Sequence, residues 1–477
     1  MLSQDSYAYK TCSSHLEMEQ GHIEQTYSIP PSAPCTVDTQ ATEKEKKWTL
    51  PETVAKTRMD GGEHIGPMRY SWPIQTAFTM SYLRPVSIHL GLFSDDGERK
   101  NCHQVKLSHL QRLVQRGQAT SGLQDAAEFT RRILIRFEAL GKEIKALHRP
   151  VEGFLERWER KPETMLEELL LDAAFIVEQL LQYWEAGTRP TKVVHAARLY
   201  RNDLVLFVNQ IPYVLLLELI KLVKIQAEAG DDVFLKRIAI GYIVAEEASE
   251  WLLASYDGPV RHLLHLVYLH LASTVERRRP AAPPQPPRRW GCCKALRRAH
   301  GTTTAVAPLD NRWWSHSMIP PARDLHTAGI VVRPPGKNNS KAMRRCLADV
   351  RLRARVLELQ PLDLSGFDFR LLANLVALEL EWGWESSRRL FLSYLVFISE
   401  LVPSEMDSVL LETAGVLLGA QDGIVVELKP VPVWFLLNQL ANFNEGGELH
   451  PHFMDLAREL SSSYSLKRGT LFARSSC

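Results

Sequence analysis

The sequence lacks the long apolar run that a membrane-spanning helix requires. Such a helix needs about 20 consecutive apolar residues, and the two most apolar stretches, residues 390–402 and 213–223, are shorter and contain charged residues. The N-terminus has no basic region followed by an apolar segment, so it does not resemble a secretory signal. We therefore expect a soluble intracellular protein, either cytoplasmic or in peripheral contact with a membrane.

The chain also lacks the short motifs that mark common active sites. It contains no glycine-rich phosphate loop, no nucleophile elbow and no His-Glu-x-x-His. His262 and His265 are spaced to share a helix face, but no third ligand accompanies them at a zinc-type spacing. Cys346 lies beside two arginines, yet no base is identifiable. We expect no catalytic residue, no bound metal and no cofactor.

Charge of one sign and a disulfide pattern are both missing. The 57 Lys and Arg residues nearly balance the 55 Asp and Glu residues, for a net charge of +2, so we expect no nucleic-acid partner. The seven cysteines are scattered and odd in number, which argues against a secreted disulfide framework and favours a reducing compartment. A hydrophobic share of 45% is enough for a sizeable core.

Apolar spacing predicts a mainly α, multi-helix globular domain with a few short strands in the C-terminal half. Two stripes recur at intervals of three or four residues, which is typical of amphipathic helices. They are Phe129, Ile133, Phe137, Leu140, Ile144 and Leu147, followed by Leu166, Leu169, Ala173, Ile176, Leu180 and Trp184. Glu168 and Asp172 lie one turn apart beside the second stripe. We expect both to be solvated, because no metal-binding histidine accompanies them.

The C-terminal half reads as short strands followed by helices. Alternation from Val356 to Leu364 predicts one or two strands. We expect helices at about residues 368–382, 386–401, 405–417 and 430–443.

Composition divides the chain into five regions. Residues 1–75 are polar and aperiodic, which predicts a disordered tail. Residues 76–275 and 305–445 form the two helical parts, and residues 446–477 form a C-terminal tail.

Between the two helical parts, residues 276–304 form a basic, proline-rich loop. It is open to interpretation as a solvated insertion, a nuclear-import signal, an anionic-surface patch or a polyproline ligand. Its adjacent Cys292 and Cys293 are candidates for lipidation, which is the route we expect for any peripheral membrane contact.

The most informative stretch runs from Asp203 to Ile220. Two apolar segments flank Asn209, Gln210 and Pro212. Proline disfavours a continuous helix, so we expect one helix to end near Asn209 and another to begin at Pro212. The two amides then serve either as hydrogen-bond partners for the freed backbone groups or as the lining of a polar ligand pocket.

This stretch resembles the signature of the plant DUF247 family, also called UPF0481, which reads roughly Asp-Leu-Leu-Leu-Leu-Glu-Asn-Gln-Ile/Leu-Pro. Asp203, Asn209, Gln210, Ile211 and Pro212 match, and Val208 replaces the usual glutamate. Ordered similarities extend from about residue 84 to about residue 443. They include Val86-Ser87-Ile88, the helix around Asp172, His262-Leu-Leu-His265, Leu325 to Ile330, and Leu372 to Glu379 with Asn374.

The resemblance implies a helical protein whose relatives are mostly uncharacterised. Some relatives are implicated in self-incompatibility recognition in grasses, so we expect a non-enzymatic interaction or signalling protein whose partner is another protein. The alternative is an enzyme of unknown type with a site at the junction of Asn209, Gln210 and Pro212. Many family members carry a C-terminal membrane anchor, and no such segment is seen here. Besides that junction, the motif residues that could line a pocket are Asp172, Asp203, Asn374 and Glu379.

Overall fold

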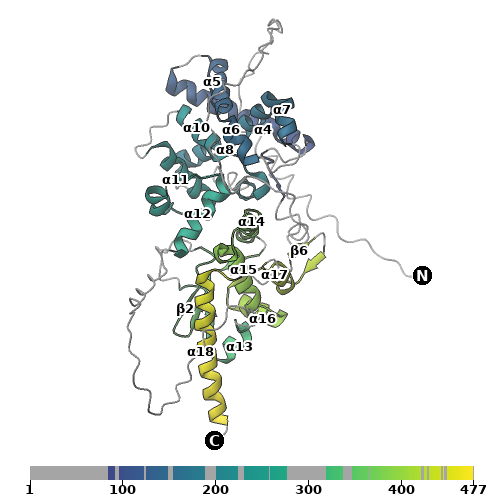
Figure 1. The fold of residues 1–477 in the computed structure, drawn as a ribbon, viewed down its shortest axis with the longest axis vertical. Coiled ribbons are helices and arrows are strands. Elements are labelled where there is room, and N and C mark those ends of the chain that lie inside the picture. The colour runs from purple at the N-terminus through teal and green to yellow at the C-terminus, as the bar shows by residue number, and fades with distance from the viewer. Residues whose placement is uncertain are drawn as a thin grey trace, which may run out of the picture. The chain divides into compact units, whose positions relative to one another are not determined.

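The structure, a computed structural model, is mainly α-helical, with short strands in the C-terminal half, as predicted (Figure 1). The chain divides into two units, Met1–Met59 and Asp60–Cys477, and every described residue belongs to the second. The described residues are 84–91, 96–122, 125–148, 154–187, 200–223, 230–256, 258–276, 319–336, 346–364, 366–419, 424–426, 429–441, 444 and 448–475. The predicted tail over residues 1–75, most of the loop at 276–304, and Cys292 and Cys293 lie outside them.

Helix α8 (Pro162–Ala186) is the hub of the first helical group. It contacts α4 (Asp96–Ser121), α5 (Ala126–Ala139), α7 (Phe154–Arg160) and α10 (Tyr213–Val223). A further short helix, α6, spans Gly141–His148. Most of the two predicted stripes is buried, including Phe129, Ile133, Phe137, Leu169, Ala173, Ile176 and Leu180. Trp184 is the exception, because it lies in the last turn of α8 and remains 50% exposed.

The chain around the proline differs in detail from the prediction. Residues 200–204 are helical, and the helix stops there rather than near Asn209. A separate 3-10 turn, η1 (Phe207–Asn209), follows, and α10 begins at Tyr213, directly after Pro212. The break comes earlier because Leu206 is extended, with a φ of −75° and a ψ of 132°. Helix α11 (Asp231–Val244), the π-helical turn η2 (Trp251–Ser255) and α12 (Leu263–Glu276) complete this group.

Three small sheets lie in the C-terminal half. Strand β3 (Val356–Glu358) is central, with β1 (Val331–Arg333) parallel on one side and β2 (Arg351–Arg353) antiparallel on the other. Strand β4 (Leu362–Asp363) pairs with β5 (Leu417–Leu418), and β6 (Ile424–Val426) pairs with β7 (Lys429–Val431). The stretch from Val356 to Leu364 thus supplies two short strands, as its alternation predicts.

The helices of this half are α13 (Ala322–Thr327), α14 (Phe367–Glu381), α15 (Leu390–Leu401), α16 (Glu405–Thr413), α17 (Val433–Ala441) and α18 (Pro451–Ser475), with a 3-10 turn, η3, at Ser386–Arg388. The helix predicted at 405–417 ends earlier, because Gly415 takes a left-handed φ of 73° and the chain then enters β5. Residues 446–477, assigned above to a tail, contain α18. Its Phe453, Leu456, Ala457 and Leu460 are buried at amphipathic spacing.

No helix among the described residues combines the length and the apolar character that crossing a bilayer requires.

Candidate functional site

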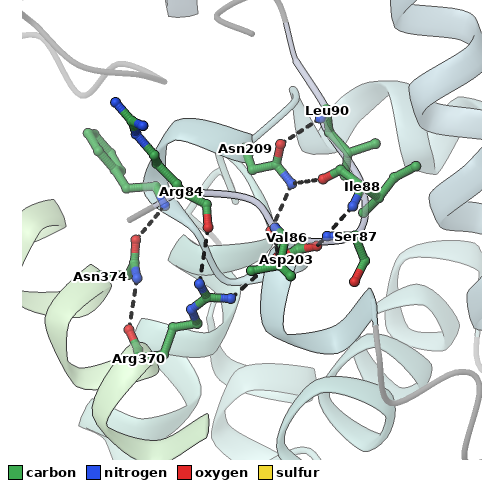
Figure 2. Close-up of polar contacts among 10 residues, drawn as sticks. Arg84, Val86, Ser87, Ile88, Leu90, Asp203, Asn209, Arg370 and Asn374 are labelled. Atoms are coloured by element: carbon green, nitrogen blue, oxygen red, sulfur yellow. Dashed lines mark hydrogen bonds and ion pairs between the residues drawn. The ribbon is translucent and has the colours of Figure 1, made fainter. Parts of the chain in front are cut away.

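The carboxylate of Asp203 is fully buried and binds the backbone of an extended N-terminal segment. Its oxygens accept hydrogen bonds from the backbone N–H groups of Val86 at 3.0 Å, Ser87 at 2.6 Å and Ile88 at 2.9 Å (Figure 2). Hydrogen bonds to an ionised acceptor are about twice as strong as neutral ones. Asp203 therefore fixes the position of a segment that precedes it by more than a hundred residues.

Arg370 of α14 balances the charge of Asp203. Its Nη1 lies 3.4 Å from Asp203 Oδ1, and its Nη2 donates to the carbonyl oxygen of Arg84 at 3.0 Å (Figure 2). Sequence reasoning missed Arg370. The available signal was an arginine at the start of the long apolar run of α14, because an arginine buried there needs a carboxylate partner.

Asn209 joins the same N-terminal segment to the helix that carries Asp203. Its Nδ2 donates to the carbonyl oxygens of Ile88 at 3.0 Å and Asp203 at 2.9 Å, and its Oδ1 accepts from the N–H of Leu90 at 2.5 Å. Both amide hydrogens are therefore bound to backbone oxygens. As predicted, the side chain is buried and serves the backbone, although the segment it holds lies far from Pro212 in sequence.

Gln210 satisfies the carbonyl groups that the helix break leaves open. Its Nε2 donates to Leu204 O at 2.8 Å and Leu206 O at 2.7 Å, and its Oε1 accepts from Leu264 N at 3.0 Å. Since Leu264 is in the first turn of α12, Gln210 also fixes where that helix begins. Both amide hydrogens of Gln210 are again used on backbone oxygens.

Asn374 connects α14 to the 3-10 turn η1. Its Oδ1 accepts from the N–H of Phe207 at 2.8 Å, and its Nδ2 donates to Arg370 O at 2.8 Å (Figure 2). The first of these bonds joins residues 167 positions apart. Asn374 therefore belongs to the same cluster of hydrogen bonds as Asp203 and Asn209, which sequence spacing could not show.

Asp172 holds the far end of the N-terminal segment, and this corrects the expectation that it is solvated. Its side chain is buried, its Oδ2 accepts from Gly91 N at 2.7 Å, and its Oδ1 lies 2.5 Å from the ammonium nitrogen of Lys106. Lys106 on α4 supplies the compensating charge that the sequence did not reveal. Glu168, one turn earlier, is half-buried.

These contacts define one site, which we call the clasp: the segment 84–91 together with Asp172, Asp203, Asn209 and Arg370. A model of plant proteins of unknown function, DUF247, matches residues 69–465, which include the whole clasp. The chain belongs to the DUF247 family. It matches none of the curated proteins and none of the solved structures with which it was compared.

The chain departs from the family patterns it resembles at Val208 and, within the clasp segment, from His89 onward, where Gly-Pro-Tyr-His is usual. Val208, which stands where the resemblance has glutamate, is half-buried within η1. The neighbouring Asn209 and Gln210 keep their backbone bonds without that carboxylate.

Glu379 serves a different part of the DUF247 fold. It is fully buried near the end of α14 and accepts from the N–H groups of Phe391 at 2.9 Å and Leu392 at 2.8 Å, the first residues of α15. A carboxylate at a helix N-terminus satisfies donors that have no partner within the helix. Burial nonetheless raises the pKa of Glu379 from its usual 4.5 to about 8, because it penalises the charged form more than these bonds favour it.

The remaining titratable candidates are also used structurally. His262 precedes α12, and its Nδ1 accepts from His265 N at 3.1 Å, while His265 Nδ1 accepts from Arg261 N at 3.2 Å. Burial lowers the pKa of His265 to about 3 and raises the pKa of the Cys346 thiol far above its usual value. Across the described part of the chain, no group of three or more His, Cys, Asp or Glu side chains is arranged to hold a metal ion.

Proposed function

We propose that this DUF247 protein acts by binding another protein rather than by catalysing a reaction. The observation that carries the proposal is the use of the motif side chains. Asp203, Asn209 and Gln210 direct their polar atoms at backbone groups of the chain itself. A catalytic group needs an atom within hydrogen-bond reach of the substrate. Residues whose polar atoms are bonded to the backbone in this way stabilise the fold. The surface that binds the partner is then expected elsewhere on the protein.

The environments of Cys346, the potential nucleophile, and His265, the potential base, support the same proposal. A thiol whose pKa is raised by burial stays protonated at neutral pH, and the thiolate is the reactive form. His265 is neutral at that pH, and its Nδ1 already accepts a backbone N–H. Neither Cys346 nor His265 is therefore poised for nucleophilic or acid–base chemistry.

The enzyme alternative places its site at the junction of Asn209, Gln210 and Pro212. A substrate bound there would have to displace the hydrogen bonds from both amide groups to Ile88, Asp203, Leu204 and Leu206. Leaving buried partners unpaired costs about 1–3 kcal/mol each. That cost favours the structural role of both amides.

The process we propose is recognition or signalling inside plant cells. The resemblance supports this, because some DUF247 relatives are implicated in self-incompatibility in grasses. The near-balanced charge of the chain supports a protein partner over a nucleic acid. Any membrane contact is proposed to be peripheral, through Cys292 and Cys293. A carbonate wash of plant membranes should release the protein, and retention of a Cys292→Ser, Cys293→Ser variant in the washed pellet would contradict this location.

Affinity purification of the full chain from plant tissue tests the proposed function. We expect a specific protein to co-purify in near-stoichiometric amount, and an unrelated bait of similar size and charge controls for non-specific capture. The enzyme alternative is tested by incubating the purified chain with a plant metabolite extract. It is supported if a compound is converted and if the Gln210→Glu variant, shown by circular dichroism to be folded, no longer converts it. That result without a co-purifying protein would overturn the proposal.

A further inference from the structure

The sheet of β1, β3 and β2 has two chemically different faces. Cross-strand partners point to the same face of a sheet, and side chains alternate along each strand. Val332, Leu357 and Leu352 are aligned in one row, and they face the core. The other two rows therefore form the outer face. They are Arg333, Glu358 and Arg351, and Val331, Val356 and Arg353.

Arginine dominates this outer face. Arg333 and Arg353 are exposed, as is Arg355 in the turn between β2 and β3. Within the described ranges, the guanidinium groups of these three arginines form neither an ion pair nor a hydrogen bond. Arg351 differs, because its Nη2 lies 2.9 Å from Asp349 Oδ2. Glu358 is the one acidic side chain in the two outer rows.

Two valines lie between the arginines. Val331 is 49% exposed at the edge of the sheet, and its neighbour Val356 is half-buried. Arginine is enriched at protein interfaces, and the centre of such interfaces is depleted of other charged residues. A small apolar strip bordered by arginines that lack an intramolecular partner therefore fits a protein ligand that supplies carboxylates and an apolar side chain.

We propose that this face, the arginine face (Val331, Arg333, Arg353, Arg355 and Val356), binds an acidic segment of the partner protein. This inference rests on the proposed function and identifies the surface through which the partner protein would bind. Neighbouring strands lie about 4.8 Å apart and each residue rises about 3.4 Å, so the backbones of Arg333 and Arg353, two strands and two residues apart, are separated by roughly 12 Å. This is close to the roughly 14 Å between same-face carboxylates four residues apart in an extended peptide. An apolar residue midway between those carboxylates, on the same face of the peptide, would then lie over β3 beside Val356. Arginine recognises carboxylates in a bidentate geometry that lysine does not reproduce.

The surroundings favour a peptide over an extended anionic surface. A phospholipid headgroup layer presents phosphates continuously, and Glu358 within the face would repel such a layer. The chain as a whole has a net charge of +2, which provides no broad field toward a membrane or nucleic acid. Glu358 lies opposite Arg333, and a peptide with separated carboxylates can contact Arg333 and Arg353 while it places an uncharged residue beside Glu358.

The first test measures binding of a fluorescent peptide, Glu-Asp-Leu-Glu-Asp-Leu-Glu, to the full chain by anisotropy. The test variant is Arg333→Gln, Arg353→Gln, Arg355→Gln. The matched control removes the same charge from α5 in Arg131→Gln, Arg132→Gln, Arg136→Gln, whose side chains are 66%, 51% and 62% exposed. We expect the test variant to weaken binding by roughly tenfold or more, since it removes every proposed arginine–carboxylate contact. The α5 variant should bind like the wild type.

Several outcomes would overturn the arginine face. They are no saturable binding by the wild type at millimolar peptide, equal weakening by both variants, or binding of a Gln- and Asn-substituted peptide as tight as that of the acidic one. Circular dichroism checks that the variants fold, and Arg353→Lys, Arg355→Lys, which keeps the charge, should weaken binding less than the triple variant. Vesicles of phosphatidylserine form a second arm, and loss of vesicle binding alone in the triple variant would assign the face to membranes instead.

The plant purification separates this inference from the proposed function. If the co-purifying protein is lost with the triple variant and kept with the α5 variant, both stand. If it is kept with both variants, the arginine face is overturned and the proposed function remains. If no protein co-purifies with the wild type, the proposed function fails whatever the peptide shows.

Discussion

Asp203 and Arg370 are 167 positions apart in the sequence, yet their side chains meet at 3.4 Å in the interior. Both also bind the backbone of the segment 84–91, Asp203 through three N–H groups and Arg370 through the carbonyl oxygen of Arg84. One ion pair thus holds three distant parts of the DUF247 chain together.

Replacing Asp203 by Asn should destabilise the protein severely. The substitution leaves Arg370 buried without its counter-charge, and removing one partner of a buried pair costs about 3–5 kcal/mol. Urea unfolding followed by circular dichroism measures this directly. Asp455→Asn is the control, because that carboxylate is 62% exposed and pairs with Arg458, so its loss should cost less than about 1 kcal/mol. Similar losses for both variants would contradict the role of Asp203.

Replacing Asn209 by Ala should lower the free energy of unfolding by about 1–3 kcal/mol. The substitution removes the hydrogen bonds from the Asn209 side chain to the buried N–H of Leu90 and to the carbonyl oxygens of Ile88 and Asp203, and of these the Asp203 oxygen still accepts from Leu206 N. Asn438→Ala is a suitable comparison, because that amide makes one bond to Trp434 O within its own helix. An unchanged melting temperature in the Asn209→Ala variant would contradict the structural role of the amide.

Gly117→Ala should destabilise the protein although alanine favours helices. A Cβ at Gly117 on α4 would overlap the ring of Phe129, which is 2% exposed and has no room to move. Overpacking costs about 1–3 kcal/mol, which exceeds the roughly 1 kcal/mol that alanine gains over glycine in a helix. At Gly141, the nearest atom, of Trp158, is 3.5 Å from such a Cβ, so Gly141→Ala should be tolerated. Partial recovery in Gly117→Ala, Phe129→Leu would confirm the clash as the cause.

The stability of the protein relative to a Glu379→Gln variant should fall as the pH rises. The folded protein keeps a proton on Glu379 up to about pH 8, whereas the unfolded chain releases it near the usual pKa of 4.5. Between these values the unfolded state binds fewer protons, so the free energy of unfolding decreases with pH, at most by about 1.4 kcal/mol per unit. The contribution is complete below about pH 4.5 and lost above about pH 8. Unfolding both proteins in urea from pH 5 to pH 8 tests this, and a constant difference would contradict it.

Local patterns predicted the helices well because their periodicity is a property of neighbouring residues. The stripes at Phe129 and Leu169 form as expected, and the alternation after Val356 yields short strands. The proline at 212 also separates two helical segments, although Leu206 moves the break upstream. These outcomes depend on spacings of two to four residues, which a single sequence displays.

The partners of the buried charges could not be predicted in the same way. Lys106 reaches Asp172 and Arg370 reaches Asp203 only once α4 and α14 have packed. Asp172 was expected in solvent because carboxylates beside an apolar helix face are usually solvated, and its cation, Lys106, lies on another helix. The segment 84–91 is even less conspicuous, since its backbone, rather than its side chains, makes the contacts with Asp203 and Asn209. Contacts made by backbone atoms do not depend on the type of side chain, so the pattern of residues does not reveal them.

The hydrogen bond from Arg370 to Arg84 limits when this part of the fold can form during synthesis on the ribosome. The bond joins residues 286 positions apart, so the segment 84–91 is synthesised long before that partner exists. At about 5–20 residues per second, the interval is roughly 15–60 s. Asp203 is itself without its cation for the 167 residues that precede Arg370, or roughly 8–33 s at the same rate. The N-terminal helices should therefore be poor candidates for expression as a separate fragment.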